Sequence, residues 1–229
     1  MYAFKLLDAL IANNQQASLA AYMTTIWSLL LHRMQEQMKD GKTPRYCRSF
    51  LHSFSLFAAL YSGDALVKAL SALEEGLVNM VIIQIWTHNR DSCATADPLD
   101  IKEMVIGGTR ILCETSVSTD PTVFGSLLKS LIVLLDDSVG GVHEDTEGLD
   151  DEADSREFDS AYSKLAYAGV TDVDPTEEIP SGPIYFAQAL SALSRTRPGT
   201  VGQVVRTALD VKEQGVLQAL LTKCGLTIE

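Results

Sequence analysis

The fold is decided by two consecutive segments, Asp97-Pro-Leu-Asp-Ile-Lys-Glu-Met-Val-Ile-Gly-Gly-Thr-Arg-Ile-Leu-Cys-Glu-Thr115 and Asp120-Pro-Thr-Val-Phe-Gly-Ser-Leu-Leu-Lys-Ser-Leu-Ile-Val-Leu-Leu135. Each segment begins with an Asp-Pro pair, which places an N-cap residue type before a proline at the first helical position. Apolar residues then recur at three- and four-residue spacing, as they do on one face of a helix. Because the joint at Ser118-Thr119-Asp120 is short, it forces the two helices into an antiparallel hairpin.

The same pattern continues over the rest of the chain. Helices are expected at 2–13, 16–39, 44–61, 64–87, 98–115 and 121–137, then at 158–167, 183–197, 198–209 and 211–224. No run alternates apolar and polar residues between Asn-Gly or Asp-Gly turns, so we expect no strands. The sequence therefore predicts an all-α protein of HEAT-like antiparallel helical hairpins, stacked as an α-α superhelix (a solenoid). The periodicity alone leaves an irregular helical bundle open as the alternative.

Charge divides the chain into three parts. The net charge is −12, yet residues 136–178 hold 15 of the 30 acids and only two of the 18 bases. We expect hairpins over 1–137 with the first hairpin incomplete, an acidic insertion loop over 138–157, and terminal helices over 158–229 that cap the solenoid. A strongly acidic segment repels nucleic acid and anionic membranes but attracts basic protein surfaces.

Motifs for catalysis are missing from the sequence. There is no Gly-x-Ser-x-Gly, His-Glu-x-x-His, Walker-type or Gly-x-Gly-x-x-Gly pattern, and the four cysteines form no Cys-x-x-Cys. The four histidines are too far apart in sequence to suggest a zinc site, so we interpret them as surface or hydrogen-bonded structural residues. Gly107-Gly108 lies within a helical stripe and favours close helix packing over a ligand loop. The stretch 172–178 has only a superficial likeness to a calcium loop.

Four stretches carry a resemblance to a known family. They are Phe158-Asp-Ser-Ala-Tyr-Ser-Lys-Leu-Ala-Tyr-Ala-Gly169, Ala187-Gln-Ala-Leu-Ser-Ala-Leu-Ser194 with Pro198-Gly199, Tyr46-Cys-Arg-Ser-Phe-Leu51, and the region 27–33. Taken in their order along the chain, they resemble the carboxyl-terminal HEAT repeats of the exportin-2 family, also called cellular apoptosis susceptibility proteins or importin-α re-exporters. Members of that family are several times longer, so we expect this chain to be a fragment that starts at Met1, with 2–13 as the second half of a hairpin.

The resemblance implies a function in nuclear transport. Family members carry importin-α from the nucleus to the cytoplasm in a complex with Ran-GTP, gripped by the concave face of the superhelix, and so shuttle between the two compartments. Ran binds mainly to repeats near the amino end of the family, which this chain lacks. The GTP belongs to Ran, so we expect no cofactor, no metal and no enzymatic activity in the chain itself. Neither nucleic acid nor a membrane is an expected partner. A generic HEAT or armadillo scaffold in a cytosolic complex is the alternative, and an unrecognised enzyme is a third.

Two groups of residues are candidates for partner binding and for docking. The acidic loop either only connects helices or offers a contact for a basic partner, and its candidates are Glu144, Asp145, Glu147, Asp150, Asp151, Glu152 and Asp154. The stretch after it is expected to dock on the solenoid through Phe158, Tyr162, Leu165 and Tyr167.

Overall fold

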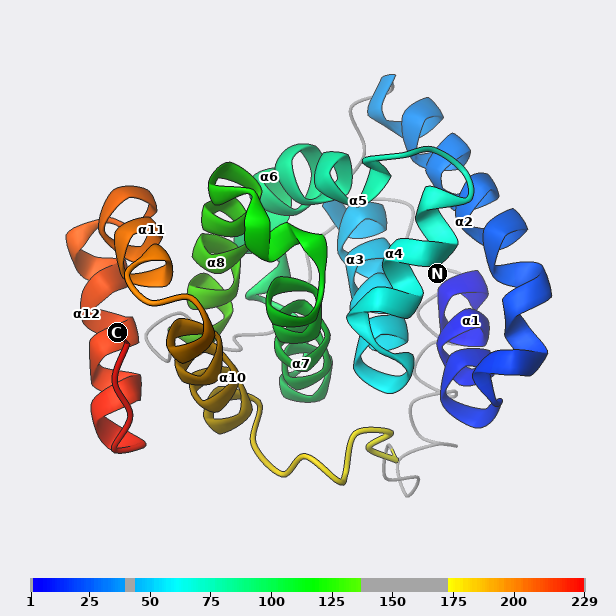
Figure 1. The fold of residues 1–229 in the computed structure, drawn as a ribbon. Helices are drawn as coiled ribbons and strands as arrows, with labels where there is room; N and C mark the ends of the chain where they lie inside the picture. The colour runs from blue at the N-terminus through cyan, green and yellow to red at the C-terminus, as the bar shows by residue number, and fades with distance from the viewer. Residues whose placement is uncertain (1, 40–43, 137–172, 229) are drawn as a thin grey trace, which may run out of the picture.

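The protein is described by a computed structural model, which covers residues 2–39, 44–136 and 173–228. All regular structure within these ranges is helical, which confirms the predicted all-α, HEAT-like class. Figure 1 shows the helices side by side in a curved array, with α2 at one end and α12 at the other. The two termini lie at opposite ends of the array.

The helices follow each other with short joints. In chain order they are α1 (Tyr2–Asn13), α2 (Gln16–Lys39), α3 (Pro44–Tyr61), α4 (Gly63–Ser71), α5 (Leu77–Met80), the π-helix η1 (Val81–Trp86), α6 (Thr87–Cys93), α7 (Pro98–Glu114), the 3-10 turn η2 (Ser116–Thr119), α8 (Pro121–Leu135), α10 (Gly182–Thr196), α11 (Thr200–Ala208) and α12 (Val211–Lys223).

The array has two layers. In one layer α1 packs on α3, α3 on α7 and α7 on α10, so that each helix contacts the next. In the other layer α6 packs on α8, and α8 packs on α11 and α12. Among the described helices, α3 and α7 pack together over the longest interface. Repeat proteins are built in this way, because each hairpin covers the apolar face of its neighbour.

Most predicted helices begin and end within two residues of the expected positions, and the helix predicted at 158–167 lies outside the described residues. The helices at 2–13, 16–39 and 44–61 have the expected bounds, and Asp120 caps α8 by accepting hydrogen bonds from the backbone of Thr122 (2.9 Å) and Val123 (3.2 Å). The single helix expected at 64–87 is wrong. It ends at Ser71, and a second helical rod runs from Leu77 to Cys93. Gly76 before this rod has φ 80°, a left-handed conformation that interrupts the helix.

Aromatic side chains form the core between α2, α3 and η1. The Trp27 ring on α2 meets the edges of Phe50, Phe54 and Phe57 on α3 at centroid distances of 5.8, 6.2 and 6.0 Å. Phe54 in turn contacts Trp86 of η1 at 6.2 Å. Such edge-to-face pairs add stabilisation beyond the area that the rings bury. The aromatic chain therefore ties three consecutive elements together.

Glycine permits the closest approach between two helices. A Cβ atom at Gly107 on α7 would lie 1.9 Å from the carbonyl oxygen of Ser55 on α3, which no side chain could tolerate. The neighbouring Gly108 faces Leu131 and Trp86. The glycine pair thus serves helix packing, as its place in an apolar stripe predicted.

The carboxyl-terminal helices are fastened to the middle of the array. Gly182 at the start of α10 lies against Val105 of α7, and Arg110 Nε donates to the hydroxyl oxygen of Tyr185 at 3.3 Å. Arg197, which follows α10, donates to the carbonyl oxygen of Ser118 at 2.6 Å. No helix in the described part of the chain is long and apolar enough to cross a membrane.

Candidate functional site

The predicted partner-binding residues lie outside the described ranges. These are Glu144, Asp145, Glu147, Asp150, Asp151, Glu152 and Asp154 of the acidic loop and the docking residues Phe158, Tyr162, Leu165 and Tyr167. Their roles stay predictions. The structure describes the residues on either side of the segment 137–172. It therefore shows where the chain leaves the array before this segment and where it returns after it.

The segment leaves the array beside α12. Asp136 caps the end of α8, and its Oδ2 lies 2.8 Å from Nζ of Lys212. This hydrogen bond raises the pKa of the Lys212 ammonium above its ordinary value. The ion pair joins α8 to the first turn of α12, so the point of departure lies next to the last helix of the array.

The segment returns along α7. Lys102 Nζ forms an ion pair with Asp174 and donates to the carbonyl oxygen of Thr176 at 3.2 Å. Asp174 also accepts hydrogen bonds from the Thr176 backbone and hydroxyl, each at 2.8 Å. Burial acts to raise the pKa of the Asp174 carboxyl, but the bonds from Lys102 and Thr176 outweigh it and hold the pKa below its ordinary value. We name residues 173–181 the return strand, although this segment consists of turns and bends and is not a β-strand.

The return strand explains the weak likeness to a calcium loop. The carboxylate of Asp174 takes its positive partner from Lys102 of the protein and its remaining donors from Thr176. The sequence carried a signal for the local part of this arrangement, because an Asp two residues before a Thr is typical of an Asx turn. Lys102 is 72 residues away, so no spacing rule could have paired it with Asp174.

A cluster of titratable groups joins α1, α3 and α7. His52 on α3 lies with Nε2 2.6 Å from Glu103 Oε2 and 3.5 Å from Asp100 Oδ1, and with Nδ1 3.4 Å from Asp8 Oδ2. Ser53 Oγ donates to the other oxygen of Asp8. Burial disfavours the charged imidazolium, but the bonds to Asp8 and Glu103 outweigh it and raise the pKa of His52 to about 10.

This cluster is best explained as a structural ion-pair network. His52, Asp100 and Glu103 offer three atoms within 4.8 Å of one another, which could in principle hold a metal ion. The short bond between Nε2 and Glu103, however, already engages the ring nitrogen that an ion would need. A protonated His52 between three carboxylates also supplies the positive charge that the cluster requires. His52 is thus hydrogen-bonded to Glu103, and its structural role stays a prediction.

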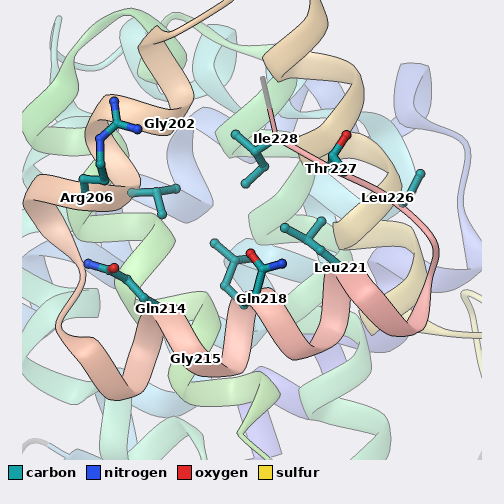
Figure 2. A pocket seen from close by; sticks show the side chains of 11 residues that line it. Gly202, Arg206, Gln214, Gly215, Gln218, Leu221, Leu226, Thr227 and Ile228 are labelled. Atoms are coloured by element: carbon teal, nitrogen blue, oxygen red, sulfur yellow. The ribbon is translucent and has the colours of Figure 1, made fainter.

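A groove of about 500 Å³ lies at the carboxyl end of the array. Figure 2 shows α11 on one side, α12 as the floor and the terminal residues Leu226–Ile228 folded back over it. Gln214, Gln218 and Leu221 point into it from α12, and Arg206 belongs to the facing wall. Arg206 is the single charged side chain among its lining residues, so the groove holds no pair of groups suited to acid–base chemistry.

A second groove lies at the amino end. It has about 480 Å³ and is lined by α1 and α2, through Leu10, Asn14, Ser18, Leu19, Tyr22, Thr25 and Ile26. None of these side chains carries a charge at neutral pH. The described surface thus offers contact areas at both ends of an array, which suits a protein that binds other proteins.

Comparison with known proteins matches nearly all of this chain to a known family. The family model described as "CAS/CSE protein, C-terminus" matches residues 1–220. Exportin-2 from Homo sapiens is 28% identical over 229 residues, which covers 98% of this chain and 23% of the human protein. Exportin-2 from Xenopus laevis is 29% identical and from Oreochromis niloticus 30% identical, each covering 94% of this chain and 22% of the relative.

The family match also covers regions where the resemblance in the sequence is diffuse. They include α1 and the helical rod from Leu77 to Cys93. The chain spans less than a quarter of the length of the curated relatives that it matches. Those relatives are nuclear transport receptors, and this supports the prediction that the chain binds other proteins and is not an enzyme. The chain belongs to the CAS/CSE family of nuclear export receptors and corresponds to its C-terminal region.

Proposed function

We propose that this chain acts as the carboxyl-terminal part of a receptor that carries importin-α from the nucleus to the cytoplasm in a Ran-GTP-dependent complex. The observation that supports it best is the family match over residues 1–220. A carrier gated by a partner GTPase needs no catalytic residues or cofactor of its own. It needs an extended surface on a scaffold that can change its pitch, and stacked helical hairpins provide one.

The acidic segment is proposed to assist cargo binding. Its two flanking residues are held by the Asp136–Lys212 and Asp174–Lys102 ion pairs, so the ends of the segment are attached at α12 and α7. Residues 136–178 carry a net charge of −13. A basic cargo segment would be attracted to this charge at long range, which raises the association rate more than the final affinity.

A chimeric receptor tests the proposal. In it, the region of Homo sapiens exportin-2 that matches this chain is replaced by the chain itself, and immobilised importin-α is offered with Ran loaded with GTP or GDP. We expect the chimera to be retained with Ran-GTP and lost with Ran-GDP. The matched control is the human protein truncated before the replaced region. Retention of the chimera no better than that of this control, or retention that ignores the nucleotide, would contradict the proposal.

The receptor function implies that the whole protein shuttles between nucleus and cytoplasm. Ran is proposed to contact mainly the part of the receptor that precedes this region. The chain alone should therefore bind Ran-GTP weakly or not at all. The family match favours this function over a generic scaffold, because it specifies an export receptor and not only a helical repeat.

A further inference from the structure

Two glycines lie on the walls of the groove at the carboxyl end, which we call the α11–α12 groove. Gly202 belongs to α11 and Gly215 to α12 (Figure 2). A Cβ atom at Gly215 would meet no neighbouring element within 4 Å, whereas one at Gly107 or Gly125 would lie 1.9 or 2.7 Å from an atom of another helix. Glycine inside a helix is destabilising, and helix packing in the described part of the chain gives no reason for Gly215. A bare backbone at such a place suits the close approach of a ligand.

The α11–α12 groove is lined largely by apolar side chains. They are Val205 from α11, Leu217 and Leu221 from α12, and Leu226 and Ile228 from the tail. Hydrogen bonds hold the tail in place, because the Leu226 backbone donates to the Leu221 carbonyl oxygen and Ser191 Oγ donates to that of Thr227, each at 2.9 Å. The groove is therefore closed on its third side by the protein itself and offers a preformed apolar surface.

Arg206 gives this apolar groove its charge. It is exposed on α11, and within the described part of the chain it forms no ion pair or hydrogen bond. The two acids nearby in the sequence are already engaged. Asp210 and Glu213 form the capping box of α12, and Glu213 Oε2 also lies 3.2 Å from Nζ of Lys129. An unpaired guanidinium beside apolar side chains is suited to bind a carboxylate.

The charge of the carboxyl-terminal helices also favours an acidic partner. Residues 182–228 contain five bases and two acids, a net charge of +3, although the whole chain carries −12. The acidic loop of the chain itself is a poorer match for the groove. Its candidate acids between Glu144 and Asp154 are accompanied by a single large apolar residue, Leu149, which does not complement five apolar lining residues.

We propose that the α11–α12 groove is a docking site for an acidic, amphipathic peptide segment of another protein. Large apolar side chains of this segment contact Leu221 and Leu226, its backbone lies against Gly215, and one of its carboxylates accepts hydrogen bonds from Arg206. A nucleic acid is excluded by the apolar lining, which gives its phosphates too few donors. The site goes beyond the receptor function proposed above, because neither importin-α nor Ran enters the argument.

A random peptide library displayed on phage and selected on the complete chain tests the chemistry of the occupant. We expect the enriched peptides to combine Asp or Glu with Leu, Ile or Phe. The most enriched peptide is then synthesised with a fluorescein label, and its affinity is measured by fluorescence polarisation. Arg206→Glu should weaken this affinity about tenfold or more, because like charges then meet at the groove. Arg206→Lys keeps the charge but not the guanidinium fork, and it should weaken the affinity only about threefold.

Two further variants separate docking in the groove from general charge attraction. Arg195→Glu is the matched control, since Arg195 is exposed on α10 and does not line the groove. It reverses the same charge and should change the affinity by less than about twofold. Gly215→Leu fills the groove with a good helix former. It should weaken the peptide about tenfold without lowering the melting temperature, because the occupant loses its close approach to α12.

Three results would overturn the proposal. The first is a selection that enriches no peptide, or only peptides without acids. The second is an affinity that Arg206→Glu leaves unchanged or that Arg195→Glu weakens equally. The third is tighter peptide binding after Asp150, Asp151, Glu152 and Asp154 are exchanged for their amides, because the acidic loop of the chain itself would then be the occupant. None of these results bears on the retention of importin-α by the chimeric receptor.

Discussion

His52 shows how one residue can join helices that lie far apart in the sequence. Its partner Asp8 precedes it by 44 residues and Glu103 follows it by 51, so no motif could have revealed the cluster. The histidine side chain is only 13% exposed, and Glu103 beside it is 5% exposed. A charged pair at this depth is stabilising only while it is complete, because loss of one partner leaves an unpaired buried charge. The cluster therefore makes the α1–α3–α7 layer sensitive to the protonation of a single ring.

We expect the stabilisation from His52 to decline as the pH rises. The folded protein holds the pKa of His52 at about 10, above the ordinary value of 6.5, so folding is favoured by proton uptake. The contribution is fully present below pH 6.5 and is lost as the pH approaches 10. Between pH 6.5 and 8.5, the difference in the free energy of unfolding between the wild type and His52→Gln should shrink by more than about 1 kcal/mol. Urea denaturation across this range measures it.

The control is His32→Gln. His32 is 74% exposed and only 4.0 Å from Glu36, so its removal should give a difference that stays flat with pH. The comparison stops at pH 8.5, because burial raises the pKa values of the Cys93 and Cys113 thiols to about 12. Ionisation of these thiols in the unfolded chain therefore reduces the stability of both proteins above that pH. A constant difference for His52→Gln would mean that the ring is not charged in the folded state.

Gly107 allows a second prediction at the scale of the residue. Gly107→Ala places a methyl group where the Ser55 carbonyl oxygen already lies, so α3 and α7 must move apart. The free energy of unfolding should fall by more than about 2 kcal/mol, as other overpacked cores do. Gly215→Ala on α12 is the matched control, because nothing lies within 4 Å of the added methyl group. That variant should be stabilised by up to about 1 kcal/mol through helix propensity.

Thermal denaturation of both variants decides this prediction. If Gly107→Ala melts at the wild-type temperature, the close contact between α3 and α7 does not exist in solution. If Gly107→Ala fails to fold, a soluble yield well below that of Gly215→Ala supports the prediction in the same way. The two glycines thus separate the effect of close packing from the effect of backbone flexibility.

At the scale of elements, local chemistry decided how well the sequence predicted the helices. The bounds of α3 were predictable because Pro44 fixes its start and an aromatic stripe runs to Tyr61. The break between α4 and the rod that begins at Leu77 was not predictable. Apolar residues keep helical spacing on both sides of Gly76, and this stripe hides the interruption. The π-helical turn at Val81–Trp86 left no periodic signature either, since it shifts the hydrogen bonds by one residue without changing composition.

The return strand is the element whose attachment can be tested most directly. Lys102→Gln removes the ion pair to Asp174 and the charged donor to the Thr176 carbonyl oxygen. Amide hydrogen exchange in 173–181 should then become several-fold faster, while α7 keeps its protection. Lys68→Gln, at an exposed position on α4, is the control and should change neither region. Unchanged exchange after Lys102→Gln would show that packing contacts such as those of the buried Thr176, and not the ion pair, hold the return strand.

At the scale of the whole molecule, the fold was far more predictable than the contact surfaces. Helical period and proline positions recur along the chain, so an all-α stack could be inferred from many independent signals. A protein-binding surface has no such repetition. The α11–α12 groove emerged only when the structure brought Arg206 of α11, Gly215 of α12 and Leu226 of the tail to the lining of one groove. Sequence spacing alone places these residues in separate elements and does not say which of their faces stay uncovered.

The uneven charge of the molecule leads to a last prediction. Exchanging Asp150, Asp151, Glu152 and Asp154 for their amides removes four of the charges in the acidic segment. If these residues are a solvated contact element, the melting temperature should not fall, whereas the association rate of the chimeric receptor with importin-α should drop about three- to tenfold at low salt. The salt dependence of that rate should also become weaker, because screening then has less charge to act on. Glu177→Gln with Glu178→Gln is the control, since both side chains are exposed on the return strand and lie outside the predicted acidic loop 138–157. A melting temperature several degrees lower would instead make the acids structural, and an unchanged association rate would leave the segment as a connection between α8 and the return strand.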